Sequence, residues 1–244
     1  VSTLSVFASQ DLSSMEWISE REVSDHPTHL MSGYAQSKWV AEKILQQTQR
    51  QGIPISIYRP GRITGHSQTG ACHLDDFLYR LLIGCIQMGS IPDLDMSVDM
   101  TPVDYVSQAI VSLSLNSSQT SPFHLCNPAP VHWRWLCQHL QILGYTLDYL
   151  NYSEWKEQLL AKVFHAPEHP LYPLLPILLK EAELEDVIKQ TRLLQFDAQN
   201  TQQGLKDTLI KCPPINEELL RTYLVYLFKH RYIPLPTYIH QEEF

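Results

Sequence analysis

Hydrophobic and polar positions follow two kinds of pattern along the chain. Short apolar runs at residues 1–7, 53–58 and 123–126 are typical of buried strands. Residues 34–51 have the spacing of a helix that stops at Gly52, with its apolar positions on one arc: Val40, Ala41, Ile44 and Leu45. Strand, helix and strand with short joints predict the βαβ unit of a parallel sheet, and hence an α/β fold.

The rest of the chain is punctuated by Pro and Gly into further helical segments. Helices are predicted at 75–88, 102–115, 133–143, 153–164, 174–190 and 216–229, and residues 10–32 are predicted to be a long loop. Helices dominate after residue 130. The sequence therefore predicts a βα part in residues 1–130 and a mostly helical part in residues 131–244.

Composition and charge exclude several classes of protein. With 244 residues, 44% of them hydrophobic, the chain can bury a sizeable core, whereas its net charge of −8 argues against binding to a nucleic-acid backbone. No apolar run reaches the ~20 residues that would span a membrane. The five cysteines are scattered and form no Cys-x-x-Cys pair, so we expect reduced thiols, no structural metal and a cytoplasmic location.

Tyr34 and Lys38 are the strongest candidates for chemistry. Residues four apart on a helix share a face, with a rise of ~6 Å between them, and the wheel places Tyr34 inside the apolar arc and Lys38 at its edge. The lysine ammonium would favour the phenolate, so Tyr34 could act as an acid at neutral pH. The pair alone is a weak signal, and it favours an amphipathic helix that carries a half-buried tyrosine and an extended lysine.

Several longer motifs stand in a fixed order around this pair. They are residues 33–42 (Gly-Tyr-Ala-Gln-Ser-Lys-Trp-Val-Ala-Glu), 58–70 (Tyr-Arg-Pro-Gly-Arg-Ile-Thr-Gly-His-Ser-Gln-Thr-Gly), 102–106, 123–128 and the Pro-rich stretch 212–236. Together they resemble the thioester reductase (R) domain of nonribosomal peptide and polyketide synthetases and of carboxylic acid reductases. That domain belongs to the extended short-chain dehydrogenase/reductase superfamily.

The resemblance implies a fold and a set of site residues. Residues 1–130 would be the C-terminal half of a Rossmann-like domain, a partial parallel sheet without its N-terminal cofactor half, and residues 131–244 a mostly helical substrate-binding subdomain. Thr3, three residues before Val6, matches the catalytic hydroxyl, with Ser2 as its rival. Tyr34 matches the proton donor and Lys38 the residue that assists it and holds the nicotinamide ribose. The resemblance assigns four residues to the cofactor side of the site, namely Pro60, Gly61, Arg62 and Ile63, although Arg62 could equally form a surface salt bridge.

The implied reaction is reductive release from a carrier. A hydride from NADPH would reduce the thioester carbonyl of an acyl or peptidyl chain that a carrier domain holds on phosphopantetheine, which releases an aldehyde and the thiol. A second hydride transfer to the alcohol is open. Two alternatives remain: another extended short-chain reductase or epimerase, and a non-catalytic fragment that docks a carrier domain.

One expected motif is missing from the sequence. The Gly-x-x-Gly-x-x-Gly turn, which lets a pyrophosphate approach a helix N-terminus, does not occur among the nine glycines. The chain also opens within a predicted strand. We therefore expect a fragment that does not bind NADPH appreciably alone, with an open sheet edge that the missing half or a dimer mate covers.

Three weaker candidates have both a functional and a structural interpretation. His165 and His169 could bind a metal, but Pro167 between them favours a surface loop. Asp75 and Asp76 form a carboxylate pair, but they open a predicted helix and suit its dipole. The apolar run 171–179 could line a substrate channel, dock a partner or form plain core.

Overall fold

The structure, a computed structural model, describes residues 1–7, 17–22, 30, 32–116, 121–180, 188 and 195–236. The chain forms two compact units, each built from three segments. The first unit consists of Val1–Thr64, Asp99–Pro130 and Leu193–Pro214, and the second of Gly65–Val98, Val131–Arg192 and Ile215–Phe244. The boundary predicted at residue 130 is one of the positions where the chain passes between the units. As a division between catalytic and substrate-binding domains it stays a prediction.

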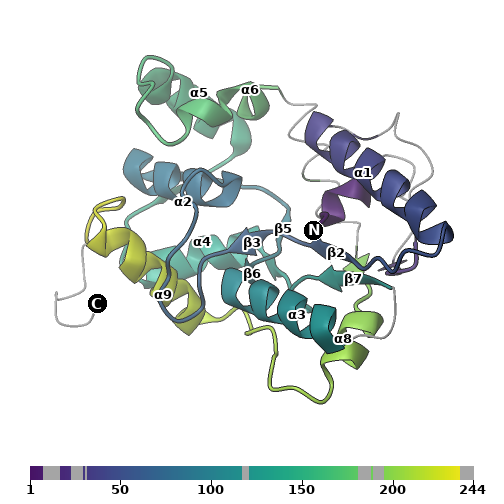
Figure 1. The fold of residues 1–244 in the computed structure, drawn as a ribbon. Helices are drawn as coiled ribbons and strands as arrows, with labels where there is room; N and C mark the ends of the chain where they lie inside the picture. The colour runs from purple at the N-terminus through teal and green to yellow at the C-terminus, as the bar shows by residue number, and fades with distance from the viewer. Residues whose placement is uncertain are drawn as a thin grey trace. The chain divides into compact units, whose positions relative to one another are not determined.

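A pair of parallel strands lies at the centre of the first unit (Figure 1): β2 (Ile57–Pro60) and β7 (Pro122–Leu125). On one face Tyr58 and Phe123 stack, with ring centroids 5.5 Å apart, against α3 (Val103–Asn116) and α8 (Gln199–Leu205). On the other face Arg59 and His124 point toward η1 (Leu4–Phe7) and α1 (Gly33–Arg50). Helices on both faces of a parallel pair confirm the predicted α/β class.

Two further parallel pairs extend the first unit. β1 (Trp17–Ile18) pairs with β10 (Gln195–Phe196), and β3 (Ile63–Thr64) pairs with β6 (Thr101–Pro102). Each of these pairs joins segments that lie far apart in the sequence. The pairing of β3 with β6 fixes the backbone immediately after the Pro60–Gly61 turn, so it matters for the candidate site.

The predicted helices of the first unit are confirmed, with end signals that the structure shows directly. The hydroxyl of Ser32 accepts a hydrogen bond from Ala35 N and caps the start of α1, which ends at Arg50. Gly52 then takes a φ of +93°, a conformation that glycine adopts without strain. α3 begins after Pro102 and carries Asp104 in its first turn, where a carboxylate favours the helix dipole.

Two predicted strands are wrong in part. Residues 1–7 do not form one strand, because Leu4–Phe7 is a 3-10 helix in which Ser5 N donates to the side-chain oxygen of Thr3. Such local hydroxyl bonds compete with the ladder of a sheet. The strand predicted over residues 53–58 begins only at Ile57. Pro54 has no N–H to donate, and Ile53 is 51% exposed.

The second unit is mostly helical; it holds the predicted helical part, residues 131–244, except Leu193–Pro214, which belongs to the first unit. Its elements are α2 (Phe77–Met88), α4 (Trp133–Ile142), α5 (Tyr152–Val163), η4 (Tyr172–Leu174), α6 (Leu175–Leu178) and α9 (Glu217–Lys229). The helix predicted over residues 174–190 is wrong in part, because α6 ends at Leu178 and residues 179–180 are not helical. Most residues beyond 180 lie outside the described part. The predicted loop at 10–32 likewise lies largely outside it, and among its described residues Trp17–Ile18 form the strand β1 instead of a loop.

Short strands and two tryptophans organise this unit. β4 (Ser90–Pro92) pairs with β9 (Asp148–Leu150) in parallel, and β5 (Ser97–Val98) pairs with β8 (Val131–His132) in antiparallel orientation. The indole N–H of Trp133 donates to Pro92 O at 2.9 Å, and that of Trp155 donates to Ser90 O at 3.2 Å. Both rings are fully buried, so α4 and α5 are fixed onto β4 by packing and by a satisfied polar group.

The apolar run at 171–179 belongs to the core. Four of its leucines are at most 7% exposed, namely Leu171, Leu174, Leu175 and Leu178. Leu171 packs directly over Gly84 of α2: a Cβ built on Gly84 would stand 2.9 Å from Cδ2 of Leu171. These contacts favour the core interpretation over a channel lining or a docking segment.

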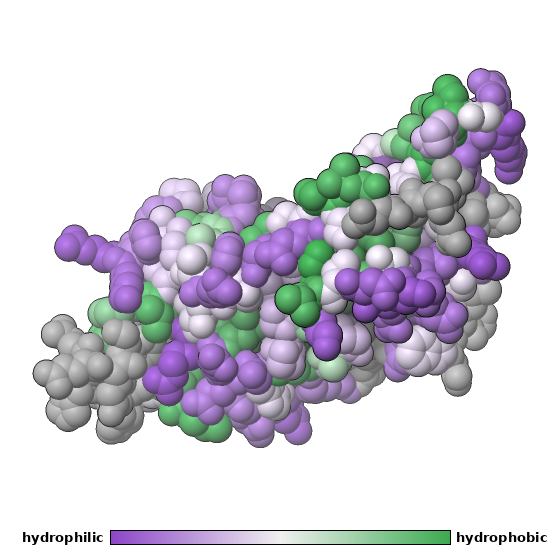
Figure 2. Space-filling model, turned by 60° about the horizontal axis from the view of Figure 1, so that its bottom comes forward, coloured by the Kyte–Doolittle hydropathy of each residue, from purple (hydrophilic) through white to green (hydrophobic). Residues whose placement is uncertain are grey.

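Apolar side chains also reach the surface in places. Figure 2 shows hydrophobic patches among the hydrophilic side chains of the face in view. In the first unit Val111, Leu115 and Leu209 are 56%, 79% and 99% exposed. Within the described residues no helix combines the length and the hydropathy that crossing a membrane requires.

Candidate active site

The structure places Tyr34 and Lys38 one turn apart near the start of α1, as predicted. The Lys38 Nζ lies 6.0 Å from the centroid of the Tyr34 ring and donates a hydrogen bond to Val1 O at 3.2 Å. Tyr34 is 57% exposed. A phenol that reaches solvent beside an ammonium is accessible to a reacting group, which a buried core tyrosine is not.

The orientation of α1 differs from the predicted one. The arc that was expected to face the core is exposed, with Val40, Ile44 and Leu45 at 47%, 57% and 40%. The buried positions of the helix are Ala35 and Glu42. On the buried side Glu42 binds the buried guanidinium of Arg59, and Trp39 packs against the apolar cluster that includes Leu4, Val6 and Phe7.

The predicted hydroxyl residue lies in the segment that contacts α1. Thr3 is buried, donates from Oγ1 to Ser5 Oγ at 3.2 Å and accepts from Ser5 N. Ser2 N donates to Tyr58 O, which places this segment beside β2, and Val1 receives the bond from Lys38. The structure thus brings the segment of Thr3 to the Lys38 side of the helix. Direct contact between Thr3 and Tyr34 stays a prediction.

The rival hydroxyl has a different environment. Ser2 Oγ is buried and, in the described part of the chain, has no hydrogen-bond partner; the same holds for the hydroxyl of Tyr58. An unsatisfied buried hydroxyl costs stability. This contrast between Ser2 and Thr3 makes the two candidates separable by mutation.

The turn from Pro60 to Ile63 is held by backbone hydrogen bonds and by one carboxylate. Gly61 N donates to Leu125 O at 2.9 Å, and Asp99 accepts from Arg62 N at 3.2 Å. Ile63 then enters β3 and is 39% exposed. The backbone of the predicted cofactor-side loop is therefore fixed, and its contact with a cofactor stays a prediction.

Asp99 was missed in the sequence analysis. Its carboxylate also accepts from the hydroxyl of Thr101 at 2.8 Å and from Asn127 N at 3.1 Å. Desolvation raises the pKa of this carboxyl, and the three hydrogen bonds together with the charge of Arg62 oppose that rise. The only signal in the sequence is an aspartate two residues before the Thr101-Pro102 pair.

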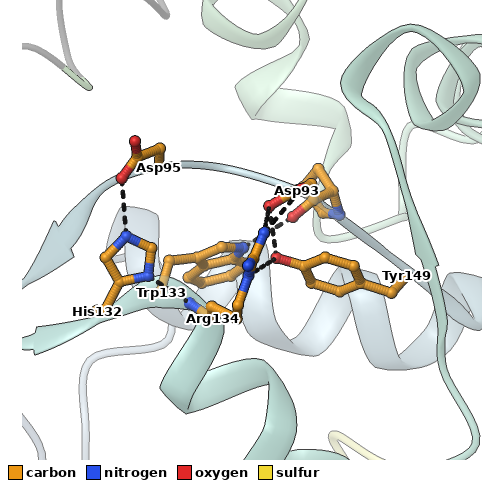
Figure 3. A network of polar contacts seen from close by, with 7 residues as sticks. Asp93, Asp95, His132, Trp133, Arg134 and Tyr149 are labelled. Atoms are coloured by element: carbon orange, nitrogen blue, oxygen red, sulfur yellow. Dashed lines mark hydrogen bonds and ion pairs between the residues drawn. The ribbon is translucent and has the colours of Figure 1, made fainter.

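A second polar cluster lies in the second unit, at the junction of β4, β9 and α4 (Figure 3). Arg134 donates from Nη2 to both carboxylate oxygens of Asp93, each at 3.1 Å, and Tyr149 donates to the same carboxylate at 2.6 Å. The bond from Tyr149, with that from Arg134, holds the pKa of Asp93 below its ordinary value. His132 accepts the N–H of Arg134 at Nδ1, so its Nε2 is the donor to Asp95 at 2.8 Å. The polar groups of this cluster are hydrogen-bonded to one another, so we interpret the cluster as structural: it holds α4 in place.

The weaker candidates take their structural interpretations. Asp76 caps α2 by accepting from Leu78 N at 2.8 Å, and Asp75 binds Arg80. Among the described residues no group of His, Cys, Asp or Glu has the arrangement of a metal site, and this covers His165 and His169. The five cysteines are free thiols.

Comparison with known proteins places this geometry in a family. Residues 1–110 match the model of an NAD-binding family described as "Male sterility protein". The chain is 35% identical over 229 residues to a linear gramicidin synthase of Brevibacillus parabrevis, which covers 93% of this chain and 4% of that protein. It is 34% identical over 221 residues to L-2-aminoadipate reductase of Saccharomyces cerevisiae, covering 86% of this chain and 15% of that protein.

A solved structure gives a closer match in length. The terminal R domain of the myxalamid PKS–NRPS biosynthetic pathway superimposes with a TM-score of 0.85 at 36% identity, over 96% of this chain and 58% of that one. The chain thus spans a small part of the curated relatives and somewhat more than half of a solved R domain. Motifs, fold and comparisons agree, and the chain matches part of the reductase (R) domains of nonribosomal peptide and polyketide synthetases.

Proposed function

We propose that this chain carries the proton-donating and substrate-binding parts of an NADPH-dependent thioester reductase, which releases an acyl or peptidyl chain from a carrier domain as an aldehyde. The observation that supports it most is the placement of Tyr34 and Lys38 beside the segment of Thr3. The unit that holds them also holds the fixed turn at Pro60–Ile63. Residues after 130 are assigned to the acyl chain and the phosphopantetheine arm.

In this proposal the residues act on the thioester carbonyl oxygen. Thr3 and Tyr34 donate hydrogen bonds to that oxygen and stabilise the charge that develops on it. NADPH, when bound, supplies the hydride to the carbonyl carbon. Tyr34 gives its proton to the oxygen, and Lys38 stabilises the phenolate that remains. The thiohemiacetal then breaks its C–S bond, its hydroxyl proton passes to the sulfur, and the aldehyde and the phosphopantetheine thiol leave.

The residues present fit one end of the cofactor. Lys38 and the exposed Tyr34 can hydrogen-bond the hydroxyls of a ribose. The turn at Pro60–Ile63, in the same unit, presents backbone groups to the nicotinamide in this proposal. No glycine-rich turn for a pyrophosphate occurs in the sequence. We assign the pyrophosphate to a dinucleotide-binding half that packs on the exposed apolar side of α1, formed by Val40, Ile44 and Leu45, with a second copy of the chain as the alternative. The reaction is assigned to the cytoplasm.

A single hydroxyl deletion tests the proton donor. In a polypeptide that joins this chain to its dinucleotide-binding half, Tyr34→Phe should abolish NADPH oxidation with an acyl-phosphopantetheine thioester, by a factor of at least about 100. Tyr58→Phe is the matched control, since it removes a phenolic hydroxyl that has no partner in the described part of the chain. Retention of most of the rate in Tyr34→Phe would refute the proton-donor assignment.

The competing functions give different outcomes in the same assay. A sugar-type reductase or epimerase would turn over its own substrate but not the thioester. A carrier-docking fragment would bind the acylated carrier with no oxidation of NADPH. The chain alone should show no NADPH binding by calorimetry, and affinity in the micromolar range would contradict the assignment of the pyrophosphate to another part.

A further inference from the structure

One buried guanidinium contacts each segment that carries a predicted site residue. Arg59 is 1% exposed and lies in β2, directly before the Pro60–Gly61 turn. Its guanidinium carbon stands 4.8 Å from the ring centroid of Phe7, which belongs to the segment of Thr3. Its Nε and Nη2 reach Glu42 on α1, the helix of Tyr34 and Lys38. Three segments distant in the sequence therefore meet at one side chain.

The contact with Glu42 has the geometry of a fork. Arg59 Nε donates to both carboxylate oxygens at 3.0 and 3.2 Å, and Nη2 donates to Oε2 at 2.7 Å. Paired donors of this kind fix the direction of a carboxylate as well as its distance. Glu42 follows Lys38 by one helical turn and Tyr34 by two, at about 40° and 80° around the helix axis. A fixed Glu42 therefore fixes the direction in which both residues point.

The other side of the guanidinium is fixed as well. Its Nη1 donates to Glu20 O at 3.1 Å and Glu22 O at 3.2 Å, and it faces His124 Nε2 at 3.3 Å. His124 Nδ1 faces the carbonyl of Asp197 at 2.8 Å and must carry the proton, which leaves Nε2 as the acceptor for Arg59. These contacts hold the guanidinium in one position, and through Glu42 they hold α1 in a corresponding position.

Stability alone gives little reason for this arrangement. The desolvation cost of a buried ion pair is often as large as its attraction, and well-packed apolar residues of similar volume hold elements together equally well. Three apolar side chains of α1 point outward, namely Val40, Ile44 and Leu45, while Ala35 is buried and Trp39 packs against the cluster of Leu4, Val6 and Phe7. What the ion pair adds to this packing is a forked, directional contact, which holds the helix in a single rotation.

We propose that Glu42 and Arg59 are the positioning pair of the reductase site: by fixing the rotation of α1, they aim Tyr34 and Lys38 at the segment of Thr3. Neither residue touches the substrate in this account. The proposal rests on the proposed function for its consequence in turnover, but its geometric part is independent of activity.

The test replaces the pair by apolar residues of similar size. The double variant Glu42→Leu/Arg59→Met should keep the fold, judged by circular dichroism, yet lose the fixed rotation. In the full reductase we expect kcat to fall about 100-fold, as small misplacements of catalytic groups do, with little change in the KM of the thioester. The matched control is Asp75→Leu/Arg80→Met, which removes an Asp–Arg pair at the start of α2, outside the residues assigned to the substrate, and should leave both constants unchanged.

A second measurement does not depend on turnover. In the chain itself, mild amine acylation followed by mass spectrometry gives the labelling ratio of Lys38 to Lys43 on the same helix. Lys38 is held by Val1 O, so the ratio should rise in the double variant and stay constant in the control. If the wild-type reductase does not reduce the thioester but the labelling ratio still rises in the double variant, the proposed function is refuted and the positioning role is kept. An unchanged ratio together with an unchanged kcat would overturn the positioning role.

Milder variants cover the case in which the double variant does not fold. Glu42→Gln keeps one acceptor oxygen and should lose part of kcat, whereas Arg59→Lys keeps the charge but lacks the fork and should lose as much as the double variant. Wild-type kcat in Arg59→Lys would show that charge alone suffices and would overturn the proposal.

Discussion

The carboxylate of Asp99 occupies the space in which a side chain of Gly61 would stand. A Cβ built on Gly61 clashes with Asp99 Oδ2 and lies 3.3 Å from the Cβ of Cys126. The same oxygen accepts from Arg62 N. Close approach therefore requires glycine at this position, and the aspartate both excludes a side chain there and holds the next residue of the turn.

Gly61→Ala should consequently disturb the turn. Either the carboxylate or the backbone must shift, and overpacking of this kind costs about 1–3 kcal/mol in the free energy of unfolding. Urea unfolding followed by circular dichroism measures the loss. Gly33→Ala is the control, since nothing lies within 4 Å of its Cβ position, and its change should be near zero or stabilising. Equal unfolding midpoints for both variants would contradict the role of Asp99.

Ser2 and Thr3 should respond to hydroxyl removal in opposite ways. Ser2→Ala removes a buried hydroxyl without a partner in the described part of the chain, so it should stabilise the protein by about 1 kcal/mol and leave turnover intact. Thr3→Val keeps the shape, loses the hydroxyl bonded to Ser5 and should reduce turnover at least about 100-fold. Thermal unfolding and the thioester assay give the two readouts. The reverse pattern in turnover would assign the catalytic hydroxyl to Ser2.

The helix of Tyr34 shows what periodicity can and cannot predict. Its end followed from Gly52, and the structure shows that Ser32 caps its start, a contact that the sequence analysis did not use. The side of the helix that is buried did not follow from periodicity. The helical wheel predicted Val40 and Ile44 in the core, whereas the structure exposes them and buries Glu42. Hydrophobic spacing carries no information about a buried ion pair whose partner, Arg59, lies 17 residues away. The apolar arc of Val40, Ile44 and Leu45 lies at the surface of this unit and not in its core.

The small strands of both units were not predictable either. β3, β5 and β6 contain two residues each, too few for any alternation to be read, and they form only because distant partners such as β8 supply the ladder. The site shows the same limit. Tyr34 and Lys38 followed from spacing and motif, whereas Asp99 acts through Gly61, a contact that sequence order does not show.

His124 should make the protein less stable in mild acid. Burial, with the neighbouring charge of Arg59, lowers the pKa of His124 to about 3. In the unfolded chain it would titrate near about 6.5, so between these values the unfolded state binds more protons than the folded state. Stability is then fully present above the unfolded pKa and falls as the pH decreases, by at most about 1.4 kcal/mol per pH unit.

The measurement compares urea midpoints between about pH 7 and pH 5 in the wild type and in His124→Gln, with the slope expected to be smaller in the variant. Burial raises the pKa of Glu20, which acts in the opposite direction because its folded form keeps a proton longer. Both proteins retain Glu20, so the difference between their slopes belongs to His124. Parallel pH profiles would show that His124 accepts a proton in the folded state.

Leu171 should be one of the costly positions of the second unit, because it is fully buried and fills the space over Gly84. Leu171→Ala leaves a cavity and should reduce the free energy of unfolding by about 2–5 kcal/mol, whereas Ile142→Ala, at a side chain 67% exposed, should change it by less than about 0.5 kcal/mol.

Gly84→Ala alone should also destabilise, since its Cβ would overlap Leu171. In the double variant the methyl group introduced on α2 occupies part of the cavity that Leu171 leaves, so the two losses should sum to more than the loss in the double variant. Strict additivity in urea unfolding would mean that the two residues do not contact each other, and a small effect of Leu171→Ala would return the run at 171–179 to the role of a channel lining.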